Sequence, residues 1–88
     1  MRAVRRHPLK QHAGGQLVQL PIGTQIIGAG IDTAEVYLWI LSRSDALTET
    51  RRIWVCATLD SIPDDLPLVR IATVENVTTT LHVFEVLS

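Results

Sequence analysis

The stretch that decides the fold is residues 36–41, which read Val36-Tyr37-Leu38-Trp39-Ile40-Leu41. All six residues are apolar, and most of them are β-branched or aromatic, which favours a strand. Because alternate side chains of a strand point to opposite sides, Val36, Leu38 and Ile40 share one face, and the other face carries Tyr37, Trp39 and Leu41. A strand that is apolar on both faces is central in its sheet or is covered by a partner on its second side.

Including this stretch, the sequence contains six runs of strand-forming residues bounded by Gly, Pro, Asp or Ser. They cover residues 16–20, 24–31, 35–41, 50–59, 68–75 and 78–86. Turn signals that recur about every ten residues are typical of antiparallel sheets. We therefore predict an all-β fold, a small antiparallel sandwich or barrel of about six strands, with Leu38, Ile40, Ile53 and Val55 in its core.

Little or no helix is expected, because no long window repeats apolar residues at helical spacing. The best helical candidate is a single turn over residues 44–50, which Ser44 or Asp45 could cap. Residues 62–67 hold two prolines around Asp64-Asp65 and predict a loop or an extended link.

The chain has 88 residues, which is the size of one domain, and we predict a single domain over residues 1–88. It is 47% hydrophobic and only 19% charged, which is rich in apolar residues for a domain that must also cover its own surface. Some of this apolar area is therefore expected to face a partner.

Charge is unevenly distributed along the chain. The net charge is −1, but four of the eight basic residues, Arg2, Arg5, Arg6 and Lys10, lie in the first ten positions. Residues 1–12 therefore form a basic arm, or an edge strand beginning near Val4. The overall balance and the lack of interleaved aromatic residues argue against nucleic-acid binding, which needs clustered and uncompensated cations.

The single cysteine, Cys56, cannot form an intramolecular disulfide, so a reducing, cytoplasmic compartment is the expected location. The longest charge-free stretch, residues 11–31, contains Pro21 and all five glycines, so we expect no membrane span.

Few residues are suited to catalysis. Cys56 and His82 lie in predicted strands and would form a nucleophile–base pair only if the strands placed them side by side. Asp60, Asp64 and Asp65 are expected to be solvated loop residues or a negative docking patch, because the alternating oxygen ligands of a calcium loop are missing. No metal-ligand spacing is present, so we predict no metal, no cofactor and no enzymatic activity.

The candidate binding residues follow from these patterns. Aromatic and arginine side chains dominate interface energetics, and acidic loops dock on basic partners. Phosphate binding by an oligomer would use the two arginines of the fourth run together with the histidine of the last. The candidates are Tyr37, Trp39, Leu41, Arg51, Arg52, Asp64, Asp65 and His82. For the aromatic ones we predict a homo-oligomer or partner complex with Trp39 at the interface.

The order of short segments also resembles a known family. The segments are Gln19-Leu20-Pro21-Ile22-Gly23, Leu38-Trp39, the turn Ala46-Leu47-Thr48-Glu49-Thr50-Arg51-Arg52, Ile62-Pro63-Asp64-Asp65, Ala72-Thr73-Val74 and Leu81-His82-Val83-Phe84-Glu85. In this order the chain resembles small uncharacterised proteins of bacteriophages and prophages that end in a Trp-His-Val-Phe-Glu-like segment. It departs from them at Ala57-Thr58-Leu59, at Leu81 and at Glu75-Asn76-Val77, where the family has a glycine turn, a tryptophan and a glycine-rich tip.

The resemblance implies a phage accessory protein in the host cytoplasm. Proteins of this class act by stoichiometric binding, so we expect an antagonist of a host defence or regulatory protein. A structural or assembly component of the phage particle is the first alternative. A nucleotide-sequestering oligomer is the second, and a weak hydrolase comes last.

Overall fold

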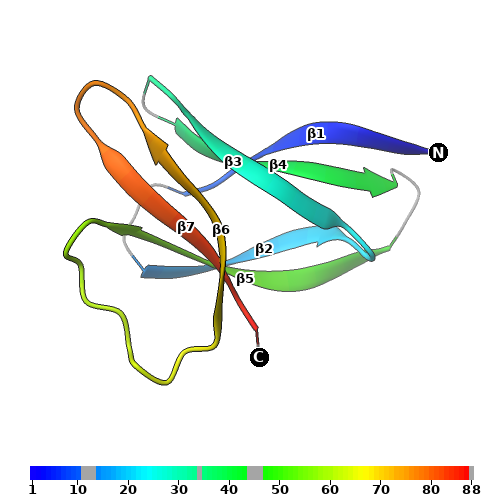
Figure 1. The fold of residues 1–88 in the computed structure, drawn as a ribbon. Coiled ribbons are helices and arrows are strands. Elements are labelled where there is room, and N and C mark those ends of the chain that lie inside the picture. The colour runs from blue at the N-terminus through cyan, green and yellow to red at the C-terminus, as the bar shows by residue number, and fades with distance from the viewer. Residues whose placement is uncertain (11–13, 34, 44–46, 88) are drawn as a thin grey trace.

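The protein is an all-β domain of two antiparallel sheets in this computed structural model, which describes residues 1–10, 14–33, 35–43 and 47–87 (Figure 1). The predicted fold class is therefore confirmed. The strands are β1 (Arg2–Pro8), β2 (Gly14–Pro21), β3 (Gln25–Asp32), β4 (Glu35–Arg43), β5 (Thr48–Ala57), β6 (Leu68–Glu75) and β7 (Thr80–Val86).

One sheet has three strands in the order β1-β4-β3, and the other has four in the order β2-β5-β7-β6. Consecutive strands β2 and β3 lie in different sheets and are joined by a tight turn in which Thr24 N–H donates to the carbonyl of Pro21 (3.1 Å). Strand β3 packs beside β6, and Asn76 Nδ2 donates to the Thr33 carbonyl there (3.5 Å). Among the described residues β1 and β2 show no comparable packing, so the sandwich is open along that side.

Strand β4 is the centre of the three-stranded sheet and shows the alternation expected of it. Val36, Leu38 and Ile40 are 1%, 0% and 4% exposed, so this face forms the core. From the other sheet, Ile53 and Val55 of β5 and Val83 of β7 meet it. All four core residues predicted from the sequence are buried.

Six strands were expected and seven are present, because the basic segment Arg2–Pro8 forms β1 and pairs antiparallel with β4. Leu9, just after it, is 5% exposed and its N–H donates to the Val36 carbonyl (2.9 Å). This apolar anchor holds the basic segment against the sheet.

The predicted helical turn over residues 44–50 is wrong at its end, because Thr48 to Thr50 already belong to β5 and pair with β2. Their partners on β2 supply ladder hydrogen bonds that a helical turn would forgo. Ser44 and Asp45, the predicted caps, lie outside the described residues. The expected loop over residues 62–67 is present between β5 and β6.

A β-bulge interrupts the pairing of β3 with β4 between Ile26 and Gly28. The extra residue, Ile27, is 54% exposed and lies outside the core. The described part of the chain contains no helix long and apolar enough to cross a membrane.

The central role of β4 predicts the cost of truncating its inner face. Leu38→Ala should lower the free energy of unfolding by about 2–5 kcal/mol, because Leu38 is fully buried and a cavity would remain. Leu17→Ala, at a side chain that is 67% exposed, is the matched control and should change it by no more than about 0.5 kcal/mol. Urea titration followed by tryptophan fluorescence measures both, and equal effects would show that Leu38 does not lie in the core.

Candidate functional site

Three of the candidate binding residues, all on β4, lie together on the outer side of the three-stranded sheet. Tyr37, Trp39 and Leu41 alternate with the buried residues of β4, and all three are partly exposed. Directly paired residues share a face, so Val4 and Arg6 of β1 lie beside Leu41 and Trp39. We call these five residues, Val4, Arg6, Tyr37, Trp39 and Leu41, the aromatic face.

The two aromatic rings of this face are held in a fixed arrangement. Their centroids lie 5.2 Å apart with an interplanar angle of 84°, an edge-to-face contact. The Tyr37 ring passes over Gly30 of β3, where an added Cβ would lie only 2.5 Å from the tyrosine oxygen. A side chain at position 30 would therefore displace the Tyr37 ring, whereas a Cβ at Gly28 would only touch Trp39, 4.0 Å from its Cδ1. The glycines of the segment Gly28-Ala29-Gly30 were the sequence signal for this packing. The signal was missed because it depends on the pairing of β3 with β4, which no single run shows.

Arg6 crosses the aromatic face from one edge strand to the other. Its guanidinium carbon lies 3.9 Å from the centre of the Tyr37 ring, and its Nη2 lies 3.6 Å from Oδ2 of Asp32 on β3. Because the side chain reaches from β1 to β3 above β4, it covers the outer face of the tyrosine. Both partners of the ion pair are exposed, so this contact orients the ring more than it stabilises the fold.

The two ends of the aromatic face differ in charge. Asp32 and Glu35 pair at the end where β3 turns into β4, and the outward parity of β4 places both on the outer side. At the opposite end lies Arg2, paired with Arg43. The face is thus acidic at one end and carries basic side chains at the other.

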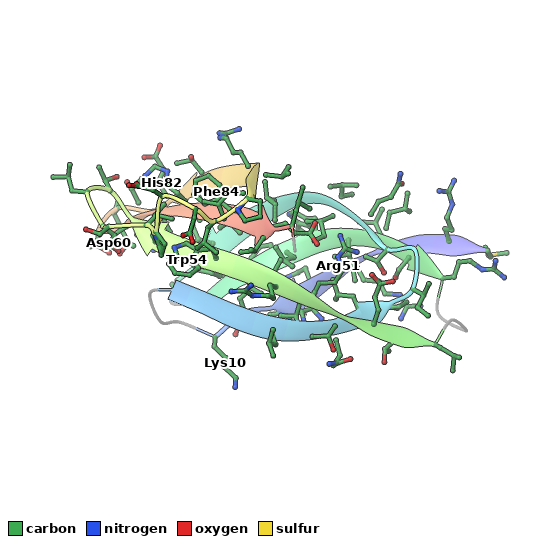
Figure 2. All side chains as sticks on the ribbon, turned by 90° about the horizontal axis from the view of Figure 1, so that it is seen from below. Lys10, Arg51, Trp54, Asp60, His82 and Phe84 are labelled. Carbon is green, nitrogen blue, oxygen red and sulfur yellow. The ribbon has the colours of Figure 1, made fainter. Side chains whose placement is uncertain are left out.

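The outer side of the four-stranded sheet is covered in part by a loop, and it also includes the exposed Leu17 and Arg52. At one end of this side, Asp60 and Ser61 of the loop over residues 58–67 line a pocket of about 270 Å³ together with Gly14, Trp54 and Cys56. The Trp54 ring rests on Gly15, with Cε3 3.3 Å from an added Cβ, and its Nε1 is buried without a hydrogen-bond partner. Figure 2 shows Trp54, Phe84 and His82 at the end of the molecule where the loop carrying Asp60 runs.

Cys56 and His82 are direct cross-strand neighbours on β5 and β7. The geometry does not activate them, however. Both ring nitrogens of His82 are hydrogen-bonded, Nε2 to Thr58 Oγ1 (2.9 Å) and Nδ1 to Thr73 Oγ1 (3.0 Å). Burial, and secondarily the charge of Asp60, raises the pKa of the Cys56 thiol, which disfavours the thiolate that a nucleophile needs.

Of the three residues suggested for phosphate binding, Arg51 and Arg52 both line a pocket of about 390 Å³, but His82 does not line it. Arg51 points to the inner side of β5 and Arg52 to the outer side. In the β5–β7 register Arg52 pairs with Val86 whereas Cys56 pairs with His82, which separates Arg52 and His82 by about 13 Å along the strands.

Arg51 instead joins the two sheets. It binds both carboxylate oxygens of Glu85, with Nη2 to Oε1 at 2.9 Å, and its Nη1 donates to the Thr24 carbonyl at the start of β3 (2.9 Å). Both side chains are 17% exposed. The hydrogen bond to Glu85 raises the pKa of Arg51 against the opposing effect of burial. This guanidinium is committed to the fold, and sequence reasoning missed the pair because its partners are 34 residues apart.

Asp64 and Asp65 lie exposed in a turn of the 58–67 loop. Asp60 is used locally, because its Oδ2 accepts the N–H of Ala57 (2.8 Å). Among the described residues no group of three or more His, Cys, Asp or Glu is arranged to hold a metal ion.

The blocked Cys56–His82 pair leads to a prediction about thiol chemistry. Ellman's reagent should modify Cys56 in the native protein at least about a hundredfold more slowly than in urea, because the thiol is 4% exposed and its pKa is raised. His82→Ala should not slow the native reaction further. A fast native reaction that His82→Ala abolishes would establish a working pair.

The Arg51–Glu85 pair leads to a prediction about stability. Arg51→Leu should lower the free energy of unfolding by about 3 kcal/mol, because it leaves a largely buried carboxylate without its cation. Arg51→Leu combined with Glu85→Leu should recover part of that loss, since no charge then remains buried. Thermal denaturation of both variants and of Glu85→Leu gives the coupling energy, and strict additivity would show that the pair is not coupled.

Comparison with known proteins gives one family. The model of a domain of unknown function, DUF7352, matches residues 1–88. No curated protein and no solved structure matches the chain. Because this family model covers the whole length of the sequence, the chain belongs to the DUF7352 family.

Proposed function

We propose that the protein is a non-enzymatic binding protein that pairs with a second copy through its aromatic face and acts stoichiometrically on another protein. The observation that carries this proposal is the position of Trp39 and Tyr37. They lie on the solvent side of a strand whose other side already supplies the core. Aromatic and arginine side chains on one flat surface are the composition of interface hot spots.

The charge pattern favours a second copy as the occupant of this face. When two identical sheets stack face to face with their β4 strands antiparallel, the two ends of the face exchange places. Arg2 of one copy then approaches Asp32 and Glu35 of the other, and the same contact occurs twice. A parallel stacking would instead bring like charges together.

Catalysis receives little support from the residues that were its best candidates. The Cys56 thiol is buried with a raised pKa, and both nitrogens of His82 are engaged. The nucleotide-sequestering alternative has weaker support, since Arg51 is bound to Glu85 and His82 lies about 13 Å along the strands from Arg52.

The identity of the partner is proposed from the family resemblance. A phage accessory protein that antagonises a host defence or regulatory protein in the host cytoplasm remains our leading hypothesis. A structural role in the phage particle remains the alternative. Both hypotheses need a surface that binds another protein. The aromatic face is the surface that we propose for self-association, so the other protein would bind elsewhere.

The proposal predicts the effect of a charge on this face. Sedimentation equilibrium at about 100 µM should give a mass above one chain for the unchanged protein. Trp39→Asp should give the mass of one chain, because an unpaired carboxylate would be buried against the second copy.

The matched control is Leu17→Asp, which places the same charge at an exposed leucine on the outer side of the other sheet. It should associate as the unchanged protein does. A monomeric unchanged protein, or equal loss in both variants, would contradict pairing through the aromatic face.

A further inference from the structure

Strand β1 has a free edge. It pairs with β4 along one side only, and within the described residues no strand pairs with its other side. An unpaired edge presents backbone donors and acceptors that can accept a further strand. Natural proteins keep such edges short, covered or charged, so a long exposed edge needs an explanation.

The register shows which backbone groups point outward. Leu9 N–H donates to the Val36 carbonyl (2.9 Å), so this pair is hydrogen-bonded, and bonded pairs alternate along an antiparallel ladder. Ala3, Arg5 and His7 therefore direct their backbone groups toward β4. Arg2, Val4, Arg6 and Pro8 direct theirs away from the sheet. Pro8 has no N–H to offer, and it stands where the ladder with β4 does not need one.

The side chains along this edge are cationic. Arg2 and Arg6 lie on the outer side and Arg5 on the inner side, and all three are exposed. Arg6 is paired with Asp32, but Arg2 and Arg5 form no ion pair with the rest of the described chain.

The arginines along this edge indicate which kind of strand can pair with it. Two β1 edges of separate copies would bring their arginines together, and like charges directly opposite each other destabilise a strand pair. An acidic strand would place carboxylates opposite the same arginines. Stacking of nucleic-acid bases is disfavoured, because Arg6 already covers the outer face of the Tyr37 ring.

We infer that the free edge of β1 accepts an extended, acidic segment of a protein partner as an additional strand. The outward backbone groups of Arg2, Val4 and Arg6 supply the ladder hydrogen bonds. Arg2 and Arg5 select carboxylates on the two sides of the added strand. The inference rests on the proposed function in that the protein binds another protein, but it uses the outward backbone groups of β1, whereas the proposed self-association uses the outward side chains of β4, including Trp39.

The probe is a fluorescein-labelled peptide as long as β1, which has seven residues, with the sequence Thr-Thr-Glu-Glu-Val-Thr-Glu. Run antiparallel to β1, it places glutamates opposite Arg2, Arg5 and Arg6 and valine opposite Val4. Fluorescence anisotropy should show saturable binding to the unchanged protein. The same peptide with lysine for glutamate should bind at least about tenfold more weakly.

Two sets of variants test the two parts of the inference. Val4→Pro removes an outward N–H without touching the ladder to β4, and should weaken binding roughly tenfold, whereas Val4→Ala keeps the N–H and should bind within about twofold of the unchanged protein. Arg2→Glu combined with Arg5→Glu should reverse the preference in favour of the lysine peptide. Circular dichroism and the thermal midpoint establish that each variant is folded.

Trp39→Asp separates this inference from the proposed function, because it removes self-association and leaves the edge intact. It should bind the glutamate peptide as the unchanged protein does. A monomeric variant that still binds the peptide would show that peptide binding at the edge of β1 does not depend on self-association. No binding of either peptide, equal binding by Val4→Pro, or tighter binding of single-stranded oligothymidine than of the glutamate peptide would overturn the inference.

Discussion

The structure depends on one constraint, which is that β4 is apolar on both sides in a domain with only two thin layers. Its inner residues, Val36, Leu38 and Ile40, meet β5 and β7 and exclude water from the core. The opposite side chains then face outward by strand geometry alone. The described residues form two layers, and none of them adds a third layer over these side chains.

The outer side chains of the two sheets are covered differently. At one end of the four-stranded sheet, Asp60 and Ser61 of the loop over residues 58–67 line a pocket with Trp54 and Cys56. On the three-stranded sheet no described segment does so. There Gly30 of β3 makes room for the Tyr37 ring, and Arg6 lies over it. This arrangement orders the aromatic side chains but leaves Trp39 and Leu41 partly exposed, and the proposed pairing with a second copy rests on that exposure.

Much of this could be predicted from local pattern. Alternation along residues 36–41 indicated which side chains share a face, and strand-forming runs marked six of the seven strands. What could not be predicted depends on contacts between distant residues. The pairing of β1 with β4, the Arg51–Glu85 pair and the contacts of His82 with Thr58 and Thr73 all join residues that are far apart in the sequence, and the order of strands in a sheet cannot be inferred from any one run. The helical turn over residues 44–50 failed in part because β2 provides a pairing partner that propensity ignores.

The most direct test of the aromatic face is a dilution series followed by amide chemical shifts in solution. If two copies stack as proposed, the shifts that change with concentration should map to β1, β3 and β4, with the largest changes near Trp39 and Leu41. Residues on the outer side of the four-stranded sheet, such as Leu17 and Arg52, should not shift. Changes confined to the four-stranded sheet, or no change over the accessible concentrations, would contradict the account.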